Sequence, residues 1–292
     1  MRVLVIGATG NVGVPTVLGL LERGADVRVL VRNEGKAREL FAGVGPGRLE
    51  IVAGELTDSA TVAAAVPGAD VAFLALHSVG PSGELQRAVI GALAEAGLPR
   101  LVRLSVLSTS HTSPGLNQRG HAVLDDVAEA TGLVYTSLRP AIFMTAVLDA
   151  AAQVRVGGGW IGTAETGRNP LIDPRDVATT AVEVLLDPAK QGQHYDLTGP
   201  ALYSWSEAAS ALADVLGRPV EFTVVDEPTL REKAARRVPD WMVELLLARE
   251  RAVETGDNER LTDWVQRLTG AAPRTLQAYL REHRAEFLPV TG

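Results

Sequence analysis

The feature that most constrains the fold is the N-terminal stretch, in which a short apolar run leads directly into a series of glycines. Residues 3–6 are all apolar, as expected of a strand that is buried on both faces. Gly7, Gly10 and Gly13 follow at intervals of three, and a helical pattern of apolar residues begins directly behind them. A strand, a glycine turn and a helix in immediate succession predict the first crossover unit of a parallel sheet.

The same turn predicts a ligand. Gly7 allows a sharp turn, Gly10 lets the backbone approach a pyrophosphate without a Cβ in the way, and Gly13 lets the helix pack closely on the strand. The N-terminus of that helix presents unpaired N–H groups and the positive end of its dipole to phosphate. We therefore expect a dinucleotide here, with a tight turn that binds nothing as the alternative.

The remainder of the first half alternates strands and helices. Further strands are expected at residues 26–31, 49–53, 71–76, 101–107 and 134–138. Helices are expected between them, at residues 36–41, from 58, at 83–96 and at 118–130. Strands that are apolar on both faces, with glycines just past the helix ends, are typical of a sheet covered on both sides. The predicted fold class is therefore α/β, with a doubly wound parallel Rossmann sheet.

The second half departs from this pattern and predicts a smaller α-rich C-terminal lobe. Helices are expected at residues 145–156, from 173, from 204 and over most of the chain up to 287, with a flexible break at 157–159 and strands at 194–197 and 220–225. We expect residues 1–150 to form the dinucleotide-binding domain and 151–292 a substrate-binding lobe at the C-terminal edge of the sheet. Residues 173–198 are expected to return to the first domain.

Composition excludes several classes of function. The chain has 292 residues and no cysteine, which excludes disulfides, a thiolate nucleophile and zinc–thiolate sites, and its five histidines lack metal-ligand spacing. No apolar run approaches the ~18 residues that span a membrane, and we expect a cytoplasmic protein without membrane association. A net charge of −7 argues against nucleic acid as the partner and leaves a small-molecule substrate.

The end of the second predicted strand indicates which dinucleotide is bound. A carboxylate there would bind a free 2′-hydroxyl and repel a 2′-phosphate. This chain instead has Arg32, whose planar charged group suits phosphate, and Lys36 about one helical turn later. These residues favour NADP(H) over NAD(H). The alternative is that both cations are simply solvated and that Glu34 weakens their field.

Together, segments along nearly the whole chain resemble one family. They are GATGNVG at 7–13, LVRN at 30–33, GELTD at 54–58, GLVYTSLRP at 132–140, DPRDVA at 173–178 and LTGAAPRT at 268–275. In this order they resemble the NmrA-like group of atypical short-chain dehydrogenases/reductases. The resemblance implies a Rossmann domain that binds NADP(H) and a small C-terminal substrate lobe.

The resemblance also implies which residues hold the phosphates and the adenine. The pyrophosphate is expected at Gly7, Thr9, Gly10, Asn11 and Val12. Arg32 would meet the 2′-phosphate, and Glu55 and Leu56 would flank the adenine. Glu55 departs from the aspartate that the family commonly has at this position.

The remaining implied contacts lie on the nicotinamide side. Ala75, Leu76 and His77 would line the ribose and the nicotinamide. Pro140, Ile142 and Phe143 would lie beside the nicotinamide, and the substrate is expected under Phe143, Met144 and Trp160. For Leu76 and Ile142, packing in the core is the alternative.

The usual catalytic pair of the wider superfamily, Tyr-x-x-x-Lys, is absent. Four residues after the four tyrosines come Arg139, Gly199, Glu207 and His283. Some reductases of the family carry a lysine eleven residues before the glycine that corresponds to Gly132, and His121 occupies that position here. A histidine can transfer a proton near neutral pH, and Asp125 could orient it. We predict His121 as the proton donor, with a capping or solvated helix residue as the alternative.

These observations favour an NADPH-dependent reductase that transfers hydride to a small apolar acceptor, such as a quinone, an enone or a related carbonyl compound. The cofactor supplies the reactive atom, so the protein has to supply geometry and a dry pocket. The missing Tyr/Lys pair leaves two alternatives: a regulatory protein that senses NADP(H) without turnover, and a redox-neutral biosynthetic enzyme on the same fold.

Overall fold

Seven parallel strands form the central sheet of the structure, a computed structural model that describes residues 1–45, 47–76 and 83–289. In sheet order they are β3 (Leu49–Ala53), β2 (Asp26–Val31), β1 (Arg2–Ile6), β4 (Val71–Leu74), β5 (Arg100–Leu104), β6 (Val134–Pro140) and β8 (His194–Leu197). The order reverses at β1, so the crevice beyond the carboxyl ends of β1 and β4 is the topological switch point, where open α/β sheets bind ligands.

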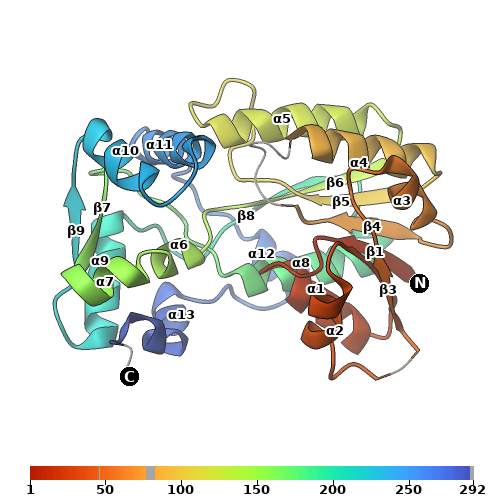
Figure 1. Ribbon diagram of the computed structural model, residues 1–292, viewed down its shortest axis with the longest axis horizontal. Coiled ribbons are helices and arrows are strands. Elements are labelled where there is room, and N and C mark those ends of the chain that lie inside the picture. Colours follow the sequence, from red (N-terminus) through yellow and green to blue (C-terminus); the bar gives the residue numbers. More distant parts are fainter. Residues whose placement is uncertain (46, 77–82, 290–292) are drawn as a thin grey trace.

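Helices cover both faces of this sheet (Figure 1). One face carries α1 (Gly13–Glu22), α2 (Glu34–Leu40), α8 (Pro174–Leu186) and α12 (Trp264–Thr269). The other carries α3 (Ser59–Ala64), α4 (Gly83–Glu95) and α5 (Leu116–Glu129). Each face has its own apolar core, which explains why the strands are apolar on both sides.

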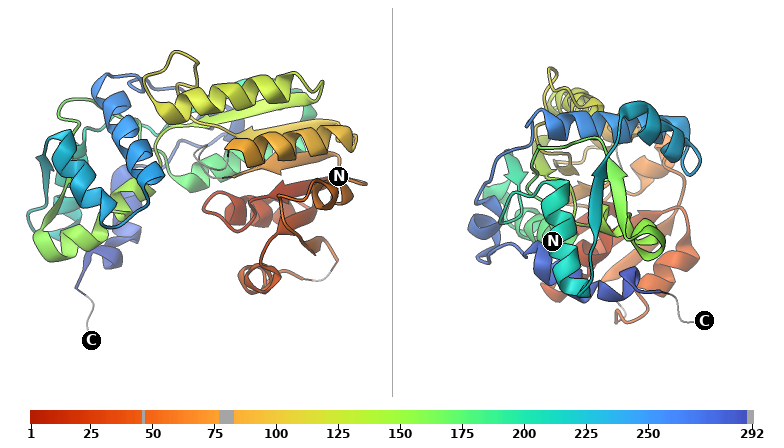
Figure 2. Two further views of the ribbon diagram at one scale, coloured as in Figure 1. Left: turned by 45° about the horizontal axis from the view of Figure 1, so that its top comes forward. Right: turned by 90° about the vertical axis from the view of Figure 1, so that its left-hand side faces the viewer.

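The second lobe lies beside the carboxyl edge of the sheet (Figure 2). It contains α6 (Thr145–Leu148), α7 (Ala151–Gly157), β7 (Gly159–Gly162), α9 (Trp205–Leu216), β9 (Glu221–Val224), α10 (Glu227–Ala235), α11 (Asp240–Glu254) and α13 (Leu276–Glu282). Short 3₁₀ helices follow α8, at Pro188–Lys190, and α13, at Arg284–Phe287. The two strands of the lobe pair in parallel, and its helices enclose a separate apolar core.

The chain leaves the sheet for the lobe just after β6. Phe143 packs against the sheet core, whereas its neighbour Ile142 packs against the lobe core. The backbone of this linker is fixed from the side, because Met144 N–H donates to Ile172 C=O over 2.9 Å. The chain then returns through α8, which Asp173 caps, and adds β8 to the edge of the sheet.

The predicted fold class, a Rossmann sheet with an α-rich C-terminal lobe, is confirmed. Two local predictions are wrong. The helix expected at residues 145–156 is interrupted at Asp149 and Ala150, where Ala150 N–H donates to Val147 C=O only three residues back. The flexible break expected at residues 157–159 is ordered: Gly158 ends α7 in the left-handed conformation with φ 74°, and β7 begins at the next residue. The domain boundary at residue 150 stays a prediction.

Candidate functional site

The glycine turn after β1 has the geometry that its sequence predicts. Gly7 adopts a φ of +88°, and a Cβ placed on it would lie 2.2 Å from the carbonyl oxygen of Ala75. A Cβ on Gly13 would lie 2.1 Å from the carbonyl oxygen of Gly7. At Gly10, by contrast, the nearest atom to such a Cβ is 3.5 Å away. Gly7 and Gly13 are therefore required by packing, whereas a Cβ on Gly10 would make only an ordinary contact, so packing alone does not require a glycine there.

Free donors line this turn. Gly10 N–H donates to Gly7 C=O and Val14 N–H donates to Gly10 C=O, but the N–H groups of Asn11 and Val12 have no acceptor in the described part of the chain. The start of α1 carries neither a side-chain cap nor an acidic residue in its first turn. The helix dipole adds positive potential at this point. This turn fits a pyrophosphate, because no described residue competes for its donors.

Arg32 is exposed directly after β2, next to the first turn of α2. Asn33 caps that helix, since its side-chain oxygen accepts from Lys36 N–H at 2.9 Å. Glu34, the carboxylate that could have weakened the field of Arg32, is bound by Arg38 through the Nε–H at 2.9 Å. Among the described residues, no carboxylate pairs with Arg32, so its guanidinium stays free for a phosphate.

The other predicted cofactor residues follow the ends of β3 and β4. Glu55 is exposed and Leu56 is half-buried against the core on the α3 face. Ala75 and Leu76 are half-buried, and Ala75 N–H donates to Ile6 C=O at 2.9 Å, which places Ala75 beside the glycine turn. His77 lies outside the described residues.

The predicted nicotinamide and substrate residues differ in their accessibility. Ile142 and Phe143 are half-buried on the linker between the two lobes, and Pro140 is buried at the end of β6. Met144 has no exposed surface, and Trp160 packs edge-on against Phe222 with their ring centroids 5.9 Å apart. Met144 and Trp160 thus belong to the core of the lobe, and their contact with a substrate stays a prediction.

His121 belongs to a buried polar cluster that packs α5 on β5 and β6. It is 2% exposed, and its Nδ1 accepts from Arg103 Nη1 at 2.9 Å. Arg103 is fully buried and also binds Asp125 and the phenol oxygen of Tyr135. Asp125 accepts in addition from Tyr135 Oη at 2.5 Å and from Arg139 Nη2 at 2.8 Å. Asp125 thus binds two arginines and a tyrosine, rather than orienting His121 as the sequence suggested.

Burial and charge keep His121 neutral. Desolvation and the neighbouring charge of Arg103 lower the pKa of His121 to about 3. Burial also raises the pKa of the Tyr135 phenol. Burial alone would raise the pKa of Asp125 as well, but the charge of Arg103 and the hydrogen bonds from Tyr135, Arg103 and Arg139 together lower it. A neutral imidazole in a closed cluster does not suit proton donation at neutral pH. The role of His121 as a proton donor stays an untested prediction that this geometry does not favour.

The sequence contained a signal for this cluster that the prediction missed. Tyr135, Ser137 and Arg139 alternate along β6, and Arg103 and Ser105 do the same along β5 and the residue after it. Polar residues with a period of two inside apolar strands mark one face of a sheet. Here that face lies against α5.

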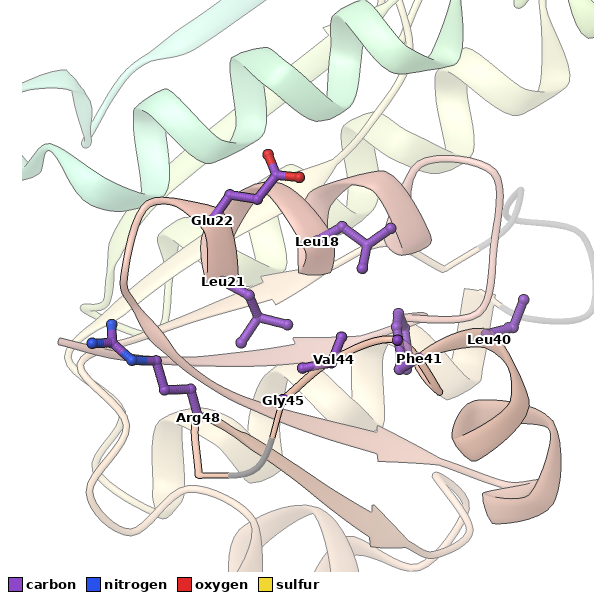
Figure 3. Close-up of a pocket in the computed structure, with 9 residues that line it drawn as sticks. Leu18, Leu21, Glu22, Leu40, Phe41, Val44, Gly45 and Arg48 are labelled. Atoms are coloured by element: carbon purple, nitrogen blue, oxygen red, sulfur yellow. The ribbon is translucent and has the colours of Figure 1, made fainter.

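A hollow of about 630 Å³ lies between α1 and the segment after α2, away from the glycine turn (Figure 3). Leu18 and Leu21 of α1 face Phe41 and Val44 across it, and Arg48 lies at one end. The lining comes from the later part of α1 and from the loop before β3, at the opposite edge of the sheet from the free donors. We do not assign the cofactor to this hollow.

A family model described as NAD(P)H-binding matches residues 7–188, which include the glycine turn, Arg32 and α8. The chain belongs to this family. An NAD(P)H azoreductase of Xenophilus azovorans is 29% identical over 98% of this chain and 99% of its own length. A (4-alkanoyl-5-oxo-2,5-dihydrofuran-3-yl)methyl phosphate reductase of Streptomyces griseus is 30% identical over 98% of this chain and 99% of its own length.

Solved structures share the whole fold. The NADPH-dependent quinone oxidoreductase of Escherichia coli, complexed with NADPH, has a TM-score of 0.88 at 23% identity and covers 97% of this chain and 99% of its own. NmrA, a negative transcriptional regulator in complex with NAD, has a TM-score of 0.76 at 18% identity and covers 99% and 98%.

The family model and the relatives confirm an NAD(P)H cofactor and the assignment to the NAD(P)H-dependent oxidoreductases, and the solved structures confirm the NmrA-like fold. The preference for NADP(H) over NAD(H) stays a prediction. The roles of the individual site residues stay predictions. Among the described residues, no helix combines the length and the apolar character needed to cross a bilayer.

Proposed function

We propose that this protein is an NADPH-dependent reductase that delivers hydride to a small apolar acceptor with a conjugated system, such as a quinone, an enone or a related carbonyl compound. The observation that carries this proposal lies at the carboxyl ends of β1 and β2. Among the described residues, the backbone N–H groups of Asn11 and Val12 have no acceptor there, and the exposed Arg32 has no carboxylate partner. The names of the relatives support reduction of conjugated acceptors, since they include azo, quinone and dihydrofuranone reductases.

In this proposal the chain mainly binds and orients. The N–H groups of Asn11 and Val12 hold the pyrophosphate, and Arg32 holds the 2′-phosphate. Ile142 and Phe143 present apolar surface beside the nicotinamide and exclude water there. The bound cofactor supplies the hydride.

In short-chain dehydrogenases the tyrosine of the Tyr-x-x-x-Lys pair is expected to supply the proton, but this chain needs another proton source. No tyrosine is followed by a lysine four residues later, and Tyr135 is buried with a raised pKa. His121 is neutral inside its cluster. We therefore propose that solvent protonates the product, as a reduced quinone or enone permits.

A second candidate function is a regulator that senses NADP(H) without turnover. The missing Tyr/Lys pair and the likeness to the fold of NmrA favour it. It makes the opposite prediction about catalysis, so one assay separates the two functions.

The experiment follows the absorbance of NADPH with a panel of quinones, enones and azo compounds. We expect oxidation that depends on both the enzyme and the acceptor, at an unchanged rate in His121→Asn near neutral pH. Tight NADPH binding without turnover on any acceptor would instead establish the sensor. Loss of turnover in a folded His121→Asn variant would contradict the solvent as the proton source.

A further inference from the structure

Besides Oδ1 of Asn258, four buried polar atoms of the C-terminal lobe have no hydrogen-bond partner among the described residues, and they belong to three side chains. They are Oδ1 and Nδ2 of Asn169, Nε1 of Trp205 and Nε of Arg249. Asn169 is 0% exposed and Trp205 is 4% exposed. A buried donor or acceptor without a partner destabilises the folded state, because it loses its hydrogen bond to water and gains none. Several such groups in one lobe point to a partner that is not part of the chain.

The three residues lie on three neighbouring segments of the lobe. The guanidinium carbon of Arg249, on α11, lies 5.3 Å from the ring centroid of Trp205, the first residue of α9. Asn169 exchanges two backbone hydrogen bonds of 2.8 Å with Tyr203, two residues before Trp205. We define Asn169, Trp205 and Arg249 as the donor corner; α9 and α11 are labelled in Figure 1.

The segment before Asn169 packs along α11, the helix that carries Arg249. Glu250 Oε2 accepts from the N–H groups of Thr163 and Ala164 at 3.2 and 3.3 Å. Further along, a Cβ on Gly167 would lie 1.9 Å from the carbonyl oxygen of Val253, so the backbone of this segment touches the helix.

The free groups are mainly donors. The N–H groups of Trp205 and Arg249 only donate, and the amide of Asn169 offers N–H as well as one oxygen. The nearby carboxylate of Glu250 does not compete for them, because its other oxygen already accepts from Arg249 Nη2 at 3.0 Å. A ligand group that satisfies this set must therefore carry hydrogen-bond acceptors, of which carbonyl and anionic oxygens are the strongest. The guanidinium of Arg249 lies over the ring of Trp205, and this cation–π contact holds the two donors beside each other.

The donor corner is connected to the predicted nicotinamide side by a short stretch of chain. Asn169 C=O accepts from Leu171 N–H at 3.1 Å, and the following residue, Ile172, forms a parallel bridge with Phe143. A ligand that reaches from Phe143 to the donor corner follows this stretch.

We propose that Asn169, Trp205 and Arg249 bind an oxygen-bearing group of the acceptor, either a carbonyl or an anion such as a carboxylate or sulfonate. The proposal rests on the proposed function in one respect: it identifies the ligand of this site as the acceptor of the hydride. It makes the three residues determinants of substrate specificity, since an acceptor without such a group leaves buried donors unpaired.

The test measures binding and does not depend on turnover. Isothermal titration calorimetry on the full chain with NADP⁺ present compares three probes of one skeleton: methylnaphthalene, acetylnaphthalene and naphthalenesulfonate. We expect at least one oxygen-bearing probe to bind about tenfold or more tightly than methylnaphthalene, because tenfold corresponds to about 1.4 kcal/mol, or one net hydrogen bond. A preference for the sulfonate alone identifies an anionic group, and a preference for both oxygen-bearing probes identifies a general oxygen acceptor.

Variants locate the preference. Trp205→Phe removes the N–H and keeps a ring, and Asn169→Leu removes the amide at similar size. Both are expected to abolish the preference while the affinity for methylnaphthalene stays within about twofold. Arg251→Gln is the matched control for Arg249→Gln, because Arg251 lies two residues further on the same helix, is exposed and pairs with Glu227. Unchanged NADP⁺ affinity shows that a variant is folded.

Equal affinity for all three probes would overturn the proposal, and so would a preference that survives in Trp205→Phe. Either result would leave the donor corner as a site of internal hydration only. A preference for oxygen-bearing probes in a protein that reduces no acceptor would instead reject the proposed reductase and retain the donor corner as a binding site.

Discussion

The guanidinium of Arg32 is exposed at the tip of β2, and the nearby carboxylate of Glu34 is bound by Arg38. A charge-assisted hydrogen bond contributes about 1.5–3 kcal/mol. Arg32→Gln should therefore raise the KM for NADPH by about 10- to 100-fold and leave the KM for NADH almost unchanged. Steady-state kinetics with both cofactors measure the two effects. Arg236→Gln, which removes an exposed arginine paired with Glu232 in the other lobe, is the control.

An equal loss for NADPH and NADH would show that Arg32 does not contact the 2′-phosphate. Lys36 could then be tested in the same way, since it lies about one helical turn from Arg32 and is also exposed.

The buried imidazole of His121 makes stability depend on pH. In the unfolded chain its pKa is near 6.5, whereas burial and the charge of Arg103 lower the pKa to about 3 in the folded state. Between these values the unfolded chain binds a proton that the folded chain does not, so the free energy of unfolding rises with pH in this window. The lowered pKa of Asp125 acts only below its ordinary value of 3.8. We expect acidification below pH 6.5 to cost on the order of a few kcal/mol.

Urea denaturation at several pH values measures this effect. His121→Asn, which keeps a polar group but removes the titration, should flatten the dependence between pH 3 and 6.5. A variant with the same slope as the wild type would contradict the assignment of this window to His121.

At the scale of elements, two glycines of the turn between β1 and α1 have different roles: Gly13 is needed for packing, and Gly10 is expected to be needed for ligand binding. Gly13→Ala places a Cβ 2.1 Å from backbone oxygen, so α1 must move and stability should fall by about 1–3 kcal/mol. Gly10→Ala has 3.5 Å of clearance and should leave the urea midpoint unchanged. It should nevertheless weaken NADPH binding by about tenfold or more, because its methyl group occupies the space of the pyrophosphate.

Thermal or urea denaturation and NADPH titration of the two variants measure these effects. A Gly10→Ala variant that binds NADPH normally would show that the pyrophosphate lies elsewhere.

Elements that rest on local patterns could be predicted from the sequence, whereas those that rest on distant pairing could not. β2, β3 and β8 begin and end where the apolar runs predict. β7 was missed because its glycines suggest a break, yet a Cβ on Gly159 would lie 2.0 Å from the carbonyl oxygen of Glu221. These glycines allow close approach to β9, a partner some sixty residues later in the chain.

The candidate site divides in the same way. The glycine turn and Arg32 belong to a single βαβ unit, so spacing and residue type were sufficient to find them. The burial of His121 depends on Arg103 and Tyr135 from two other elements, and the donor corner depends on three segments that meet only in the folded chain. No pattern within one segment carries that information.

At the scale of the whole molecule, the lobe and the sheet are joined by more than the linker after β6. Ser108 Oγ donates to Asp257 C=O and Ser113 Oγ to its carboxylate, at 2.6 and 2.8 Å, which ties the loop after β5 to the end of α11. Ser108 has a φ of 60°, an uncommon value for a residue other than glycine. Asp176 of α8 binds the backbone and the guanidinium of Arg274 near the C-terminus. These contacts fix the lobe over the cofactor edge.

The return of the chain through α8 and β8 leads to a prediction about fragments. α8 packs closely on α1, since a Cβ on Gly19 would lie 3.0 Å from Val182 Cγ2, and β8 pairs with β6 at the sheet edge. A fragment of residues 1–150 lacks both elements, so it exposes the buried face of α1 and the edge of β6.

We expect this fragment to unfold without a cooperative transition and to bind no NADPH, whereas a fragment of residues 1–198 regains both properties at lower stability than the full chain. Circular dichroism during urea denaturation and NADPH titration measure the difference. Cooperative unfolding and NADPH binding by residues 1–150 would show that the first 150 residues form an independent domain. Failure of both fragments, with the full chain folded, would show that the sheet also needs α12, whose Trp264 packs edge-on against Tyr195 of β8 at 4.9 Å. The cofactor domain would then be completed only near the end of the chain.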